Sequence, residues 1–132
     1  MVLEAVYEQD FLPCSYGFRP GRSAHQALQD LRTGFMSHGL RWVIDLDIEK
    51  YFDSISHSHL RAFLDRRVTD GVIRRMIDKW LKAGVLEDGL LRHATEGSPQ
   101  GGVISPCLSN IFLHHVLDEW FESEVRPRLK GR

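Results

Sequence analysis

The segment WVIDLDIEKYFD, residues 42–53, constrains the fold of this chain more than any other part of its sequence. Its first half alternates as a β-strand does, and residues two apart in a strand share a face. The alternation predicts a strand over residues 41–48, with Asp45 and Asp47 together on one face, before an aromatic turn. The residues expected on the opposite face, in a core, are Ile44, Leu46 and Ile48.

Two carboxylates on one strand face suggest a cation. Asp45 and Asp47 repel each other unless a positive charge lies beside them. A hard divalent ion such as Mg²⁺ suits oxygen ligands, and Mg²⁺ held by carboxylates usually serves phosphate groups. A second interpretation stays open at this point, in which one aspartate lies on a solvated sheet face and another caps the turn.

Length and composition indicate the class of protein but not its function. The chain has 132 residues, of which 42% are hydrophobic and 27% charged, as expected for one folded domain. No apolar run approaches the roughly 20 residues that span a bilayer, and Glu4, Glu8 and Asp10 interrupt any signal-peptide pattern. Cys14 and Cys107 lack metal-type spacing, which favours a reduced, cytoplasmic protein. The net charge of -1 gives no bulk attraction to nucleic acid.

Hydrophobic spacing and turn residues predict a helix-rich chain with little sheet. Helices are expected over residues 2–9, from the N-cap Ser23 to Gly39, from Ser56 or Ser58 onward, over 71–82 and over 105–124. A hairpin is expected over residues 85–91. One strand and one hairpin leave a sheet short of partners. Because the chain also opens within a helical pattern and closes on a basic tail, it is expected to be a fragment.

A second informative block is GSPQGGVISP, residues 97–106. Two adjacent glycines allow the backbone to approach a ligand closely, and Pro106 suits the first turn of a helix. Backbone amides at a helix start attract anionic groups. A glycine pair before a helix is by itself weak evidence of a site, but its occurrence about 50 residues after the acidic segment is more specific.

Three blocks together resemble the reverse transcriptases of the group II intron type, retroelement polymerases that also act as maturases. They are SYGFRPGRS at residues 15–23, DLDIEKYFD at 45–53, and the block at 97–106. The resemblance implies an α+β fold, part of a right-hand polymerase, helix-rich with a small antiparallel sheet. Residues 1–132 would form a single fragment of that domain. Within it, 1–40 would be the part connecting fingers and palm, and 41–132 the first half of the palm.

The resemblance also implies a chemistry. The intact protein is expected to be an RNA-directed DNA polymerase that transfers nucleotides from dNTPs to a primer 3′-hydroxyl with two Mg²⁺ ions. Asp47 matches the catalytic aspartate that holds both ions, and Ile48 offers a backbone carbonyl to one of them. Phe52 matches an aromatic gate that selects deoxynucleotides; a core phenylalanine is the alternative. The other expected nucleotide-binding residues are Gln100, Gly101 and Gly102.

Further residues receive weaker assignments. Arg19 and Arg22 are expected near nucleic acid or the fingers core, because guanidinium groups suit phosphate. Supporting roles are expected for Asp45 and Asp53, the latter in fixing the turn or capping the next helix. His114, His115 and Asp118 are expected on one helix, where His114 and Asp118 have metal-ligand spacing, but the surrounding apolar residues favour a packed helix with polar edges.

The sequence departs from the family in ways that bear on activity. It has no Tyr-Ala-Asp-Asp turn, no upstream fingers residues to grip a triphosphate and no thumb. The fragment is therefore expected to be inactive, to bind Mg²⁺ weakly and to self-associate through exposed palm surface. The expected partners are an RNA template, a DNA primer or target and dNTPs, without a membrane. Alternatives are a non-enzymatic maturase module that binds intron RNA, or a retron, diversity-generating or phage-defence reverse transcriptase.

Overall fold

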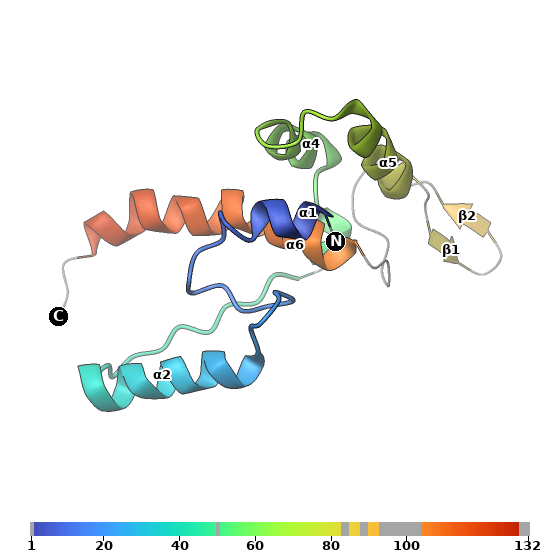
Figure 1. Cartoon of the computed structure of the whole chain (residues 1–132). Helices are drawn as coiled ribbons and strands as arrows, with labels where there is room; N and C mark the ends of the chain where they lie inside the picture. Colours follow the sequence, from blue (N-terminus) through green and yellow to red (C-terminus); the bar gives the residue numbers. More distant parts are fainter. Residues whose placement is uncertain (1, 50, 83–84, 88–89, 93–103, 130–132) are drawn as a thin grey trace.

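The structure is a computed structural model that describes residues 2–49, 51–82, 85–87, 90–92 and 104–129. Within these ranges the chain is mainly helical, and its first part contains five helices and a hairpin (Figure 1). They are α1 (Val2–Tyr7), α2 (Ala24–His38), α3 (Tyr51–Ser54), α4 (His57–Asp65), α5 (Gly71–Lys82), β1 (Val85–Glu87) and β2 (Leu90–Arg92). The helix-rich part of the expected fold is confirmed.

The C-terminal part is one long helical path, drawn from orange to red in Figure 1. It consists of α6 (Ser105–Leu113), the π-helical turns η1 (His114–Asp118) and η2 (Phe121–Val125), and the 3₁₀ turn η3 (Arg126–Arg128). The helix expected over residues 105–124 is present, but its regular α-helical part ends at Leu113. π-turns are rare in proteins and often occur at functional sites.

Local hydrogen bonds explain where two of the helices begin and end. The Ser23 hydroxyl accepts from the backbone N–H of Gln26 at the start of α2, and Gly39 ends that helix in the left-handed region at φ 64°. At the start of α5, the Asp70 carboxylate accepts from the backbone N–H groups of Val72 and Ile73 at 2.8 and 2.9 Å. These bonds hold the pKa of Asp70 below its ordinary value.

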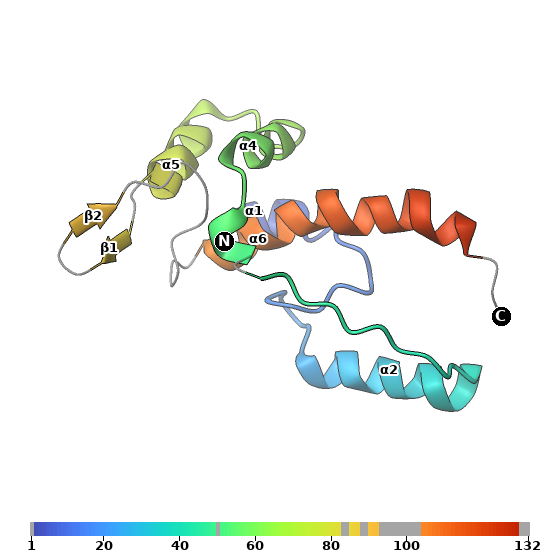
Figure 2. The same ribbon diagram turned by 180° about the vertical axis from the view of Figure 1, so that it is seen from behind.

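The core lies where α6 packs on α1 and α4. Figures 1 and 2 show α4 and α5 on one side of the C-terminal helix, and α2 on the other side. Apolar burial of this kind is the main source of stability. The buried hydrophobic residues are Leu3, Tyr7, Phe11, Ile55, Leu60, Leu64, Val68, Ile77, Leu81, Cys107, Leu108 and Ile111.

The strand predicted over residues 41–48 is not formed. This segment is extended but unpaired, and the side chains expected in a core are exposed by 83% at Ile44, 83% at Leu46 and 48% at Ile48. A strand needs a neighbour to satisfy its backbone groups. Within the described residues, β1 and β2 pair only with each other, antiparallel, with Leu86 opposite Leu91. The hairpin is thus present, but the small antiparallel sheet of the expected palm is not supported.

Helix α2 likewise has an apolar face that the described residues leave open. Leu28 is 64% exposed and Leu31 46%. The extended segment returns from the end of α2 toward α3 (Figure 2), and Trp42 within it is 91% exposed. None of the described helices is both long enough and apolar enough to cross a membrane.

Candidate functional site

The acidic segment carries its carboxylates in solvent. Asp45 and Asp47 are both exposed on the unpaired run that leads into α3. Exposed carboxylates are available to a cation, since hard divalent ions bind carboxylate oxygen. The backbone of Phe52 and Asp53 belongs to α3, while the side chains of these two residues lie outside the described part of the structure.

Tyr51 fastens the end of the acidic segment to α6. Its hydroxyl donates to the backbone carbonyl of Ser109 at 2.8 Å, across 58 positions of sequence. Burial raises the pKa of the Tyr51 hydroxyl above its ordinary value, so it remains a neutral donor. The aromatic turn after Asp47 is therefore held against the helix that follows the glycine-rich block.

The first block is fastened to the same turn of α6. The side-chain amide of Asn110 donates to the backbone carbonyl of Gly17 at 2.7 Å, across 93 positions of sequence. Ser109 and Asn110 are neighbours, so two adjacent residues of α6 hold the blocks at residues 15–23 and 45–53. The assembly of separate blocks around one helix is the main geometric feature of this candidate site.

The glycine-rich block is described only at its end. Gln100, Gly101 and Gly102 lie outside the described residues. Pro106 lies in the first turn of α6, as predicted, and Ser105 and Ser109 of that helix are buried. The helix start that was expected to follow the block is therefore present at the expected position.

Arg19 is buried, which does not fit the expected contact with nucleic acid but is compatible with the alternative, a position in the fingers core. Its guanidinium group is buried and pairs with the Glu8 carboxylate at 2.7 Å. It also donates to the carbonyls of Leu12 and Ser15 at 2.8 and 2.7 Å and lies over the Phe11 ring. These contacts occupy its donors, so Arg19 organises the loop from within and does not face a phosphate.

Arg22 retains a surface position. Its guanidinium carbon lies 5.3 Å from the centre of the Tyr16 ring, a cation–π contact. The Tyr16 hydroxyl in turn hydrogen-bonds the Asp30 carboxylate of α2. Of the two arginines, Arg22 is therefore the one placed where a phosphate can approach it.

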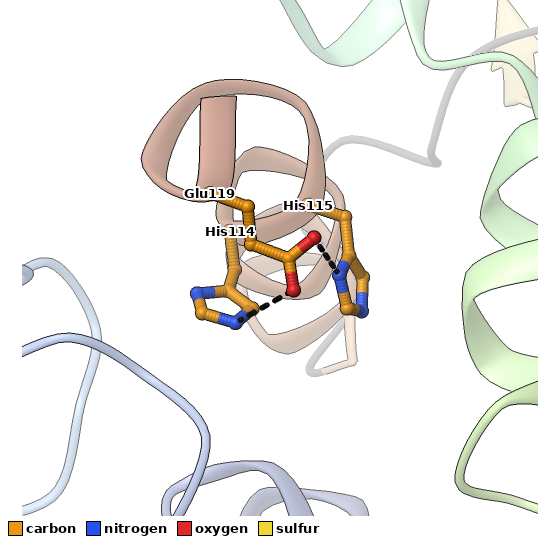
Figure 3. Close-up of side chains that lie close together, drawn as sticks. All are labelled: His114, His115 and Glu119. Atoms are coloured by element: carbon orange, nitrogen blue, oxygen red, sulfur yellow. Dashed lines mark ion pairs between the residues drawn. The ribbon is translucent and has the colours of Figure 1, made fainter. Parts of the chain in front are cut away.

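Sequence reasoning missed Glu119 as part of a side-chain cluster. Its carboxylate lies between His114 and His115 on the π-helical turn η1 (Figure 3). His115 and Glu119 are spaced by one helical turn. The approach of the Glu119 carboxylate to His114 as well depends on the π-turn. Asp118, which the spacing had paired with His114, lies 3.8 Å from Nδ1 of that residue. Burial raises the pKa of Asp118.

Known proteins match nearly the whole chain. The profile of a family described as "Reverse transcriptase (RNA-dependent DNA polymerase)" matches residues 1–126. Protein YkfC of Escherichia coli (strain K12) is 44% identical over 117 residues, which cover 86% of this chain and 31% of that protein.

Two further relatives are named for introns. Group II intron-encoded protein LtrA of Lactococcus lactis subsp. cremoris is 40% identical over 116 residues, which cover 88% of this chain and 19% of that protein. An "Uncharacterized 91 kDa protein in cob intron" of Schizosaccharomyces pombe (strain 972 / ATCC 24843) is 45% identical over 123 residues, 93% of this chain and 15% of that protein. The chain spans less than a third of the length of these three relatives.

Proposed function

The chain belongs to the reverse transcriptase family, and on this basis we propose that the protein containing it is an RNA-directed DNA polymerase of a group II intron-like retroelement. The family predicted from the three blocks is confirmed, and similarity to a group II intron-encoded protein supports the intron type. The structural observation that carries the proposal is the joining of two blocks at Ser109 and Asn110 of α6.

Asp47 is the proposed catalytic residue. Its exposed carboxylate fits a hard cation, and the Ile48 carbonyl beside it is a second oxygen of the type that Mg²⁺ accepts. Bound Mg²⁺ supplies charge stabilisation for the attacking and departing oxygens of nucleotidyl transfer. Tyr51, anchored on α6, fixes the direction in which the chain leaves this pair of ligands. Asp45 and Asp53 are proposed to support Asp47.

Nucleotide selection is proposed for Phe52 and for the glycine-rich block. An aromatic ring beneath the sugar excludes a 2′-hydroxyl by its bulk and so favours dNTPs. Gln100, with Gly101 and Gly102, would line the position of the base pair, where the absence of side chains at two glycines allows close backbone approach. Arg22 is proposed to contact the phosphate backbone of the RNA template or the DNA primer.

The 132-residue chain by itself is proposed to be inactive. One catalytic carboxylate and one carbonyl are fewer oxygen ligands than two Mg²⁺ ions require. We place the fingers–palm connection in residues 1–40 and the first half of the palm in 41–132, in a cytoplasmic protein.

Primer extension on an RNA template tests both parts of this proposal. The full-length protein should extend a DNA primer with dNTPs and Mg²⁺, and the 132-residue chain should not. Extension by the short chain contradicts the second part. A full-length protein that binds intron RNA tightly without extending any primer contradicts the first and supports a maturase that only binds RNA.

A further inference from the structure

Two buried imidazoles face one carboxylate on the helical path that follows the glycine-rich block. Glu119 Oε2 lies 3.0 Å from Nδ1 of His115, and its Oε1 lies 3.7 Å from Nε2 of His114. Figure 3 shows the carboxylate between the two rings. One ligand atom from each of the three side chains lies within 4.8 Å of the other two.

We propose that His114, His115 and Glu119 form a binding site for a transition-metal ion of the zinc class, separate from the Mg²⁺ site proposed at Asp47. Two imidazole nitrogens and one carboxylate oxygen form the donor set of zinc sites that keep a coordination position open. Mg²⁺ instead prefers an all-oxygen set in octahedral geometry. The chemistry of the donors therefore selects the class of metal.

The π-helical turn explains how three residues of one helix converge. The backbone N–H of Glu119 donates to the carbonyl of His114, five positions earlier. A turn of this type is wider than the 3.6 residues of an α-helix. The Glu119 side chain therefore stands above the gap between His114 and His115 and reaches both rings, whereas a regular helix would direct it mainly to His115.

The three ligand atoms are within reach of a metal-bound arrangement but must move closer together to form it. Zinc bonds to nitrogen and oxygen of about 2.0–2.2 Å place tetrahedral ligands about 3.4 Å apart. The distances of 3.0 Å to His115 and 3.7 Å to His114 start from different oxygens of the Glu119 carboxylate, and a set with one atom from each residue lies within 4.8 Å. The two imidazole nitrogens need to close by no more than about 1.4 Å from their limit of 4.8 Å, a shift that side-chain rotation provides.

Each of the two imidazoles turns one nitrogen toward Glu119, Nε2 of His114 and Nδ1 of His115, and the other nitrogen away from it. The side chains of His114 and His115 are only 7% and 8% exposed. Among the described residues, the nitrogens turned away, Nδ1 of His114 and Nε2 of His115, have no hydrogen-bond partner. They are the ring nitrogens that a metal ion held by the other two would leave to second partners. The Asp118 carboxylate, 3.8 Å from Nδ1 of His114, is placed to orient that ring once its other nitrogen binds a metal.

The cluster opens into a cavity of about 340 Å³, which it lines together with Asp10, Arg66 and Arg67. Arg67 is already held by two 2.8 Å hydrogen bonds to Asp10. Arg66 is 57% exposed and lies 3.7 Å from Glu119, so it is the cation that an incoming metal ion must displace. Its guanidinium group also lies 3.5 Å from Nδ1 of His115 and over the Phe63 ring, and these contacts must open when the metal ion enters.

Metal titration of the tag-free 132-residue chain tests the proposal. Calorimetry with ZnCl₂ should show one Zn²⁺ bound per chain, and excess Mg²⁺ should not displace it. Co²⁺ should give the intense visible absorption of four-coordinate nitrogen and oxygen ligands. A weak, octahedral Co²⁺ spectrum, or displacement of Zn²⁺ by Mg²⁺, would overturn the proposal without any variant being made.

Variants assign the binding to these residues. Glu119→Gln keeps the size of the side chain and should weaken Zn²⁺ binding at least about tenfold, since even indirect partners of a metal change affinity by that factor. Arg66→Gln should tighten binding about fivefold by removing a competing charge. Glu122→Gln, on the same helical path but paired with Arg126, and His25→Gln, exposed on α2, are the matched controls and should bind as the parent chain does.

The outcome is independent of polymerase activity. Asp47→Asn should leave Zn²⁺ binding unchanged, because the two sites use different residues, and circular dichroism should show that Glu119→Gln remains folded. Equal Zn²⁺ affinity in Glu119→Gln and the parent chain contradicts the assignment. If Glu119→Gln unfolds, the Zn²⁺ affinity of Arg66→Gln tests the proposal instead. A Zn²⁺ affinity equal to or weaker than that of the parent chain contradicts the site.

Discussion

Arg19 shows how one buried side chain can organise a loop. Its guanidinium group joins Glu8 on the segment after α1 to the carbonyls of Leu12 and Ser15. A buried charge is tolerated only when it is paired and hydrogen-bonded. The loop at residues 15–23 is therefore ordered by contacts made beneath its surface, which leaves its outer side to Arg22.

Replacement of Arg19 should destabilise the chain. Arg19→Ala leaves a carboxylate and two carbonyls without their donor, and we expect a loss of about 2–4 kcal/mol in the free energy of unfolding. Urea unfolding measures it. Arg22→Ala is the matched control and should cost less than about 1 kcal/mol. Equal losses in the free energy of unfolding for the two variants would show that Arg19 does not stabilise the loop.

Tyr7 should make the chain sensitive to alkali. Burial, aided by the negative charge of Asp10, raises the pKa of its hydroxyl to about 12. At a pH above about 10, the ordinary tyrosine pKa, the unfolded chain has lost this proton while the folded chain still holds it. The unfolded state then binds fewer protons, so the free energy of unfolding falls as pH rises from about 10 to 12. Tyr7→Phe should reduce this fall in urea unfolding measured across that range.

The same variant has an effect at neutral pH. The Tyr7 hydroxyl is buried and, among the described residues, has no hydrogen-bond partner. Its removal should not destabilise the chain at pH 7 and should stabilise it by up to about 1–3 kcal/mol, the cost of an unpaired buried polar group. A clear destabilisation of Tyr7→Phe would mean that the hydroxyl is paired after all.

At the scale of elements, the sequence predicted what short-range chemistry determines. Helix caps and first-turn prolines depend on neighbouring residues alone. The caps of α2 at Ser23 and Gly39 and the position of Pro106 in the first turn of α6 are all as expected. The prediction of a strand over residues 41–48 was wrong, because a strand forms only with a pairing partner. The alternation of apolar and polar residues does not reveal whether that partner is present. Likewise, the burial of Arg19 depends on Glu8, eleven positions away.

The candidate site, too, could be predicted from the sequence only where neighbouring residues determine it. The acidic segment and the helix start after the glycine-rich block were evident from residue type and spacing. The contacts that join the blocks, from Tyr51 to Ser109 and from Asn110 to Gly17, connect positions far apart in sequence. The spacing of His115 and Glu119 by one helical turn was visible in the sequence, but the approach of Glu119 to His114 depends on the π-turn.

The Tyr51 contact should matter for the alignment of the segment. Tyr51→Phe removes one hydrogen bond to α6, and we expect a loss of about 1 kcal/mol in urea unfolding of the chain. In the full-length protein it should also slow primer extension, because the turn after Asp47 is less firmly held. Ser54→Ala, which removes an exposed bond within α3, is the control. A full extension rate in Tyr51→Phe would show that this anchor is dispensable.

At the scale of the whole molecule, the described structure leaves a large apolar surface exposed. Ile44 and Leu46 are each 83% exposed and Met36 is 78% exposed. Exposed apolar side chains in this number favour association. The segment that carries Asp47 therefore holds several strongly exposed apolar side chains of the described part of the chain.

Self-association of the 132-residue chain should follow from this surface. Sedimentation velocity should show mass increasing with protein concentration, and the double variant Ile44→Thr with Leu46→Gln should shift the distribution toward the monomer, since it removes apolar area from contact with water. Val72→Thr, at an exposed position of α5, is the matched control. A parent chain that stays monomeric at high concentration would contradict the expectation.

We propose that Asp47 holds the metal ions for nucleotidyl transfer in the intact protein, and one rate comparison tests this role most directly. Primer extension on an RNA template should be measured for full-length Asp47→Asn and for Glu49→Gln, a neighbouring exposed acidic residue. We expect Asp47→Asn to lose roughly a thousandfold or more in rate, as metal-dependent stabilisation is worth several kcal/mol. Glu49→Gln should stay within about twofold of the parent. An Asp47→Asn protein that extends primers at the parent rate would contradict the claim.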